Sequence, residues 1–126
     1  MRPRNVLCLL VATALTSSIA TYVVAQEAGS NETRRIPEFE NEHVRVWKSI
    51  ITPNQPLTMH RHEQPRALIA LTGGDMTIVS DTGEERVETW ETGRAYWLTA
   101  DPPGRLHADI NKGTENIEVI VVEMNR

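Results

Sequence analysis

The stretch Thr58-Met59-His60-Arg61-His62 contains a His-x-His pair inside a run that alternates like a β-strand. In an extended chain successive side chains point to opposite faces, so His60 and His62 are expected on one face and Arg61 on the other. Two imidazoles on one strand form half of a metal site, because borderline divalent metals favour imidazole nitrogen. The remaining ligands must come from elsewhere in the chain.

The first 25 residues have the pattern of a signal peptide. Arg2 and Arg4 form a basic start, residues 6–25 are predominantly apolar, and small residues precede a cleavage point expected after Ala25. Several hydroxyl side chains dilute the apolar run, which disfavours a permanent membrane span and leaves an uncleaved anchor as the alternative. We therefore expect an exported protein, periplasmic or secreted, without stable membrane insertion after cleavage.

Charge and cysteine content exclude some classes of protein for the mature chain. The only cysteine, Cys8, lies in the signal segment, so a disulfide framework is excluded. Removal of 25 residues leaves 101, enough for one small domain. Without Arg2 and Arg4, 11 basic residues stand against 17 acidic ones, a net charge of −6. Nucleic-acid binding relies on clustered Lys and Arg, so a nucleic-acid partner is not expected.

The rest of the chain predicts an all-β domain. Residues 26–37 are polar with little to bury, which is typical of a flexible N-terminal arm, and the domain is expected over 38–126 with order starting near Phe39. Short apolar or alternating runs separated by turn residues predict strands, and no helical periodicity follows the signal segment. The expected strands are 44–51, 57–62, 67–71, 76–80, 86–90, 95–98, 106–110 and 117–123. Short strands at this spacing indicate a barrel or a sandwich.

Residues 53–111 resemble the two-motif core of the cupin superfamily. The His-x-His pair and Gly73 match its first motif. The second motif is matched by Gly93, Pro102-Pro103-Gly104, His107 and Asn111, with a longer stretch than usual after Gly93. Each motif alone is weak, and the two together are specific.

The resemblance implies a small cupin-type barrel, a double-stranded β-helix of the jelly-roll kind. In cupins three histidines meet in the mouth of the barrel, so it also implies one divalent metal ion bound by His60, His62 and His107. Three imidazoles accept iron, zinc, manganese, nickel or copper, which leaves the metal identity open. Single-domain cupins are commonly dimers, so a homodimer is expected.

This chain departs from the cupin pattern at the acidic ligand, whose place is taken by Arg66. A guanidinium about 6 Å from a divalent ion would add roughly 5 kcal/mol of repulsion at an effective dielectric near 20. Arg66 therefore either turns away to a carboxylate such as Glu63 or Glu88, or forms with the metal a cationic pocket for an anion. The loss of the acidic ligand does not by itself abolish a metal site, since cupins such as cysteine dioxygenase work with three histidines and no acidic ligand.

Three functions stay open on the sequence. The first is a metal-dependent oxygenase acting on a small anionic molecule, with Arg66, Gln64 and Tyr96 as candidate substrate-binding residues and no evident general base or nucleophile. The second is a non-catalytic metal or small-ligand binding protein of the cell envelope. The third is a cupin that has lost its metal.

Four side chains outside the metal set are expected to have structural roles. The tryptophans Trp47, Trp90 and Trp97 are predicted to be core or interface aromatics. The fourth histidine, His43, matches no metal spacing and is predicted at the surface.

Overall fold

The structure is a computed structural model that describes residues 31–126. The predicted signal peptide and the start of the predicted arm lie outside these residues. Within them the chain forms nine strands: β1 Arg34–Glu40, β2 Val44–Ile51, β3 Leu57–His60, β4 Arg66–Thr72, β5 Gly74–Ser80, β6 Glu85–Trp90, β7 Ala95–Leu98, β8 His107–Asn111 and β9 Ile117–Met124. No helix in this part of the chain is long and apolar enough to cross a membrane.

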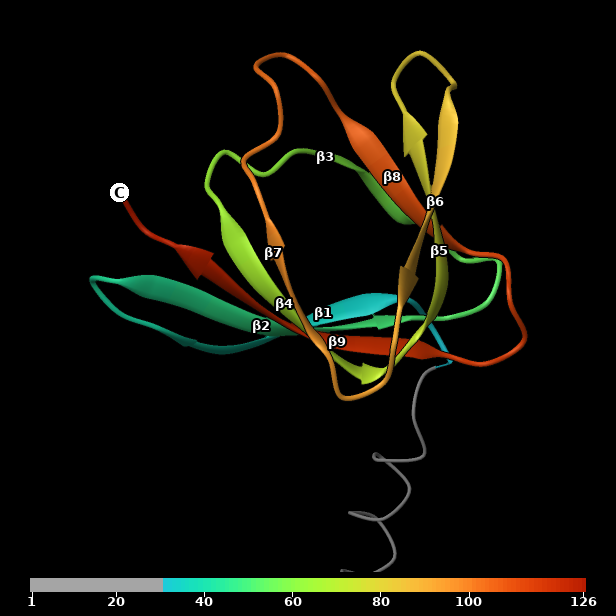
Figure 1. Ribbon diagram of the computed structural model, residues 1–126, viewed down its shortest axis with the longest axis horizontal. Coiled ribbons are helices and arrows are strands. Elements are labelled where there is room, and N and C mark those ends of the chain that lie inside the picture. The colour runs from blue at the N-terminus through green and yellow to red at the C-terminus, as the bar shows by residue number, and fades with distance from the viewer. Residues whose placement is uncertain (1–30) are drawn as a thin grey trace, which may run out of the picture. The chain divides into compact units, whose positions relative to one another are not determined.

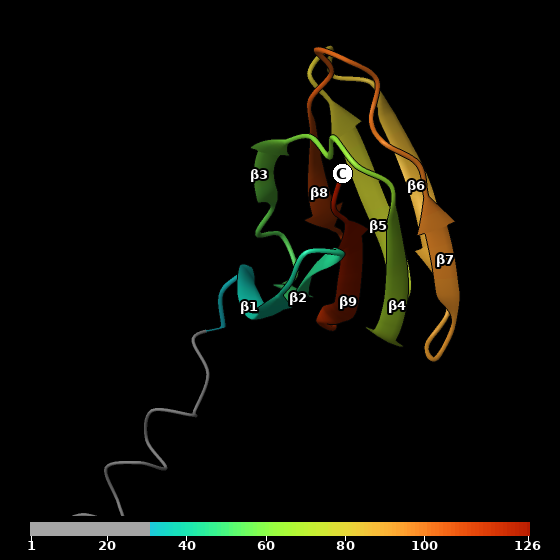
Figure 2. The same cartoon turned by 90° about the vertical axis from the view of Figure 1, so that its left-hand side faces the viewer.

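The strands form two antiparallel sheets that face each other (Figure 1). One sheet has the order β1-β2-β9-β4-β7, and the other has the order β3-β8-β5-β6. Turned by 90°, the molecule shows β5 and β8 of one sheet beside β4 and β9 of the other (Figure 2). The prediction of an all-β fold is confirmed, and each of the eight expected strands is present.

The structure differs from the sequence prediction at β1. This strand begins at Arg34 and pairs antiparallel with β2, with Arg34 opposite Ile50, so residues 34–37 belong to the sheet and not to an arm. Most of its side chains are exposed, and its register is interrupted after Pro37. An edge strand held by backbone hydrogen bonds needs no apolar alternation, which explains why the pattern gave no sign of it.

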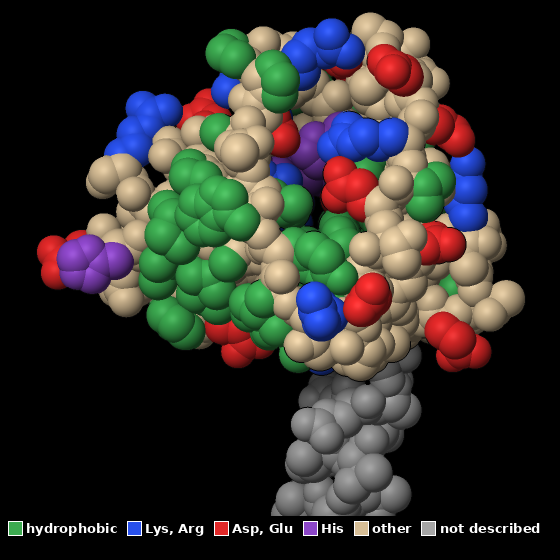
Figure 3. All heavy atoms as spheres, in the orientation of Figure 1, with side chains coloured by type: hydrophobic (Ala, Val, Ile, Leu, Met, Phe, Trp, Pro, Cys, Tyr) green, Lys and Arg blue, Asp and Glu red, His purple; other side chains and the backbone are tan. Residues whose placement is uncertain are grey.

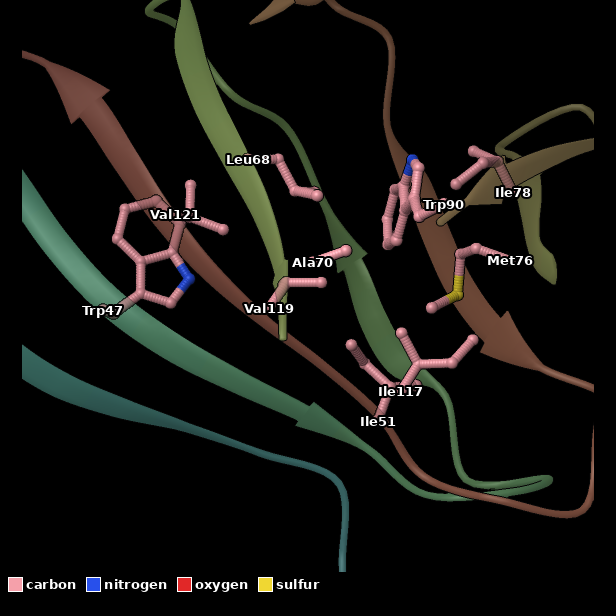
Figure 4. Packing of buried hydrophobic residues seen from close by; sticks show 10 residues of the cluster. All are labelled: Trp47, Ile51, Leu68, Ala70, Met76, Ile78, Trp90, Ile117, Val119 and Val121. Atoms are coloured by element: carbon pink, nitrogen blue, oxygen red, sulfur yellow. The ribbon is translucent and has the colours of Figure 1, made fainter. Parts of the chain in front are cut away.

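A cluster of apolar side chains from both sheets fills the interior (Figure 4). Strand alternation turns every second residue inward, as Ile117, Val119 and Val121 of β9 show. Trp47 and Trp90 are buried in or beside this cluster, as predicted, whereas Trp97 on the edge strand β7 is 60% exposed and lies outside the core.

Two residues of the cupin-like motifs hold the backbone in place. A Cβ atom on Gly73 would lie 1.9 Å from the backbone oxygen of Trp90, so only glycine allows these segments to approach so closely. The buried Asn111 donates from Nδ2 to the Ile51 carbonyl at 2.9 Å and to the Glu115 carbonyl at 2.6 Å. Both motif positions therefore have a structural reason that does not involve a ligand.

The inward face becomes polar toward one end of the sheets. On β9 the alternation continues from Val121 to Glu123, and on β4 it runs from Leu68 to Arg66. Arg66 is opposite Glu123 and Leu68 is opposite Val121, so the polar residues of the two strands lie in the same row. The interior thus has an apolar end and a polar end, and the candidate site occupies the polar end.

Candidate metal centre

The three predicted histidine ligands come together. One possible ligand nitrogen from each of His60, His62 and His107 lies within 4.8 Å of the others. The ring centroids are 4.5 Å apart for His60 and His107, 5.0 Å for His60 and His62, and 5.8 Å for His62 and His107. Pairing of β3 with β8 sets His60 opposite His107, so the sheet itself joins the two motifs.

His62 reaches the cluster in a different way from that predicted. We expected His60 and His62 on one face of one strand, but β3 ends at His60. The backbone N–H of His62 instead donates to Asp101 Oδ2 at 2.6 Å, which fixes the segment beyond the strand. The rings of His60 and His62 still lie close together, with their centroids 5.0 Å apart.

Each of the three imidazoles has its Nδ1 atom beside an oxygen acceptor. The acceptors are the Thr58 carbonyl for His60 at 2.7 Å, Glu123 Oε2 for His62 at 2.9 Å and Asp101 Oδ2 for His107 at 3.4 Å. A carbonyl or carboxylate oxygen accepts a hydrogen bond, so in His60 and His62 Nδ1 carries the proton and Nε2 keeps the lone pair. The contact of His107 with Asp101 is at ion-pair distance. Metal-binding histidines are usually oriented by such a contact.

The donor set fits a divalent cation. Among residues 31–126, His60 Nε2 is one of the few buried polar side-chain atoms without a hydrogen-bond partner. Leaving such an atom unsatisfied costs free energy, and a metal ion is one way to satisfy it. Three imidazole nitrogens on one side suit iron, zinc, copper, nickel or manganese and leave coordination positions open on the other side.

Burial keeps the histidines in the form that binds metal. Desolvation, and next the charge of Arg66, lowers the pKa of His62 to about 2. Burial also lowers the pKa of His60, against the opposing hydrogen bond to the Thr58 carbonyl. Both rings are therefore neutral near pH 7, and metal binding does not have to displace a proton from them.

Arg66 pairs with a carboxylate, as in one of the two arrangements expected, but its partner is neither Glu63 nor Glu88, and the guanidinium stays near enough to lower the pKa of His62. Its Nη1 donates to the Thr99 carbonyl at 3.2 Å, and its Nη2 lies 3.9 Å from Asp101 Oδ1. Burial lowers the pKa of Arg66, and the charge of Asp101 opposes this shift. The ion pair reduces the repulsion that an unpaired guanidinium would exert on a bound cation.

Asp101 links the parts of the site. One of its carboxylate oxygens accepts from the backbone of His62 and lies 3.4 Å from His107 Nδ1, while the other faces Arg66. It directly precedes Pro102-Pro103-Gly104 of the second motif. The sequence offered no signal that this carboxylate would face the histidines.

A pocket of about 320 Å³ opens beside the histidines, with Arg35, Trp47, His62, Arg66, His107 and Asp109 among the residues that line it. This volume is at the lower end of the range for small-molecule sites. In the space-filling view histidine lies within a hollow whose rim has basic and acidic side chains (Figure 3).

The other two candidate substrate-binding residues, Gln64 and Tyr96, are not among the residues that line this pocket. Tyr96 packs against the apolar cluster, and its hydroxyl accepts a hydrogen bond from the Glu91 backbone at 2.8 Å.

Besides Asp101, three residues near the site were missed from the sequence. Asp109 follows His107 by two positions on a predicted strand, and Glu123 continues the inward alternation of another, so their spacing could have indicated inward carboxylates. Arg35 lies on β1, the strand that the sequence did not predict. Its guanidinium carbon is 5.5 Å from the ring centroid of Trp47.

Comparison with known proteins places the fold. No protein-family model matches the sequence, and no curated protein matches it. Many solved structures, in contrast, match the structure of this chain. A cupin domain from Bordetella pertussis superposes with a TM-score of 0.67 at 19% identity, covering 75% of this chain and 95% of that one. This chain has the cupin fold.

Two further cupins support the same conclusion. An RmlC-like cupin family protein with a double-stranded β-helix fold from Methanocaldococcus jannaschii has a TM-score of 0.58 at 15% identity, covering 78% of this chain and 84% of that one. A cupin superfamily protein from Desulfitobacterium hafniense has a TM-score of 0.57 at 12% identity, covering 79% and 84%. At these identities the likeness concerns the fold, so any activity must be argued from the site.

Proposed function

We propose that this cupin binds one divalent metal ion through His60, His62 and His107, and that it is a metal-dependent oxygenase acting on a small anionic molecule. The observation that carries the metal site is the common orientation of the three rings. Each Nδ1 lies beside an oxygen acceptor, and one possible ligand nitrogen of each ring lies within 4.8 Å of the others. When bound, such an ion supplies Lewis-acid or redox chemistry at open coordination positions.

Three arginines and three carboxylates line the pocket, and the arginine that has no ion pair among the described residues supports an anionic ligand. Arg66 is engaged with Asp101, whereas the described residues give the guanidinium of Arg35 no ion pair. Arg35 lines the same pocket as His62 and His107. In this proposal Arg35 attracts the anion, and the wall formed by Trp47 restricts water on one side. Export, homodimer formation and the small-molecule partner stay predictions from the sequence.

Metal analysis of the purified full chain tests the proposed site. We expect one ion per chain, and we expect His60→Ala and His107→Ala to lose it. His43→Ala is the matched control, because the His43 side chain is 79% exposed and lies outside the cluster. A wild-type protein that binds none of Fe²⁺, Zn²⁺, Mn²⁺, Ni²⁺ or Cu²⁺ when they are supplied would overturn the proposal in favour of a cupin without a metal.

Oxygen uptake tests the reaction. The iron-loaded protein is incubated with a series of small organic acids, and the substrate is recognised by uptake that His107→Ala abolishes. Uptake with none of the acids by a protein that binds iron stoichiometrically would favour the non-catalytic binding role.

A further inference from the structure

Asp109 faces the histidine cluster from the same strand as His107. Residues two apart on a strand point to one side, so both side chains of β8 enter the interior. Asp109 Oδ2 lies 3.7 Å from His60 Nε2, and Asp109 Oδ1 lies 3.7 Å from His107 Nε2. The carboxylate therefore lies against the two nitrogens that the orienting contacts leave free, and its side chain is only 13% exposed.

These contacts are not hydrogen bonds. A separation of 3.7 Å is too long for one, and among residues 31–126 both Asp109 Oδ1 and His60 Nε2 are buried without a hydrogen-bond partner. A neutral imidazole that donates from Nδ1 presents a lone pair at Nε2, and an ionised carboxylate offers lone pairs alone. Facing acceptors in a buried site are satisfied when a proton or a metal ion lies between them.

The spacing suits a metal ion. Two ligands that are each about 2.1 Å from one ion lie about 3.4 Å apart at a tetrahedral angle. The two distances from Asp109 exceed this value by a few tenths of an ångström. Small shifts of the side chains would thus bring Asp109, His60 and His107 to bonding distance of a common centre. A larger shift is needed to include His62, whose ligand group does not contain Asp109.

We propose that Asp109 is the fourth protein ligand of the metal. This inference rests on the proposed three-histidine site and adds an acidic ligand to it. The carboxylate comes from β8, next to His107, and replaces the one whose place in the first motif is occupied by Arg66. It offsets one unit of the ion's charge and favours ions that accept both imidazole and carboxylate, such as Fe²⁺, Mn²⁺ and Zn²⁺.

Metal affinity of Asp109→Asn tests the proposal. The metal-stripped full chain is titrated with Zn²⁺ against a chelating indicator, and we expect the Kd of the variant to rise at least tenfold, since even the loss of an orienting outer contact costs about 10–100-fold. Asp75→Asn is the control, because Asp75 is an exposed carboxylate that pairs with Thr89 outside the site. Circular dichroism checks the fold, and Asp109→Ser replaces Asp109→Asn if that variant does not fold.

The absorption spectrum of the Co²⁺-loaded protein separates a ligand from a neighbouring charge. Loss of a ligand changes the visible bands, whereas Glu123→Gln, which alters an outer contact of His62, should leave their positions in place. A Zn²⁺ Kd within threefold of wild type, with an unchanged Co²⁺ spectrum, would overturn the role of Asp109 and leave the three-histidine site standing. A wild-type chain that binds neither ion would instead overturn the proposed site itself.

Discussion

The two ends of the barrel interior are built from the same strands but have opposite chemistry. On β9, Ile117 and Val119 are packed at the apolar end, while Glu123, on the same face, lies beside His62 at the polar end. On β4, Ala70 and Arg66 show the same contrast. Alternation decides which residues point inward, and the residue type at each inward position decides whether the end is a core or a site.

The difference has an energetic meaning. Complete burial of an Ile or Met side chain contributes about 1.5–3 kcal/mol, independent of pH or ligand. Burial of imidazoles and carboxylates costs free energy unless they are paired or bind an ion. The apolar end should therefore determine the stability of the fold, and the polar end should make that stability depend on protons and metal.

The largest expected effect comes from the apolar end. Ile51→Ala should lower the free energy of unfolding by about 2–5 kcal/mol, because Ile51 is 2% exposed and its truncation leaves a cavity. Urea denaturation in the presence of a chelator measures the loss. Val87→Ala, at a position that is 62% exposed, should change stability by less than about 0.5 kcal/mol. A similar loss for both variants would contradict the assignment of stability to the apolar end.

A change at the polar end should act on metal affinity. Glu123→Gln removes the charge of the acceptor 2.9 Å from His62 Nδ1, and we expect the Zn²⁺ Kd to rise about 10–100-fold, or about 1.4–2.7 kcal/mol. The matched control is Glu118→Gln on the same strand, because Glu118 pairs with Lys48 away from the histidines. Equal affinity of the two variants would show that the contact to Glu123 does not prepare His62 for a metal.

The sequence predicted the apolar end better than the polar end. Alternation and turn residues gave eight strands, with β2 and β7 at their observed bounds. The two motifs gave the three histidines, because His60, His62 and His107 have a spacing that a known family shares. Edge strand β1 was missed because its side chains are mostly exposed and follow no apolar pattern.

The surroundings of the histidines could not be predicted in the same way. Asp101 and Arg66 are 35 positions apart along the chain, and their contact depends on how a turn lies against a strand. Inward carboxylates such as Asp109 and Glu123 follow from alternation alone, but without the register a charged residue on a strand is more simply assigned to solvent. In predicting which residues face the interior, a polar residue at an inward position of a strand should be counted like an apolar one.

The smallest expected effect is a pH dependence at the polar end. The pKa of His62 falls from an ordinary 6.5 to about 2 in the folded protein, chiefly through burial. Between these values the unfolded chain binds the extra proton, so the free energy of unfolding falls as pH falls below 6.5, by up to about 1.4 kcal/mol per pH unit. Above pH 6.5 His62 contributes no pH dependence, and His60, whose pKa is also lowered, acts in the same direction.

Comparison of variants isolates this effect, because burial raises the pKa of Asp109 and of Glu123 and so gives their contributions the opposite sign. In the metal-stripped protein His62→Gln should lose less stability than wild type from pH 6.5 to pH 5, with a slope shallower by up to about 1.4 kcal/mol per pH unit. His43→Gln, at an exposed side chain, should keep the wild-type slope. Equal slopes of unfolding free energy against pH for all three proteins would mean that His62 takes up its proton in the folded state. The polar end would then be open to water and would not be a buried site.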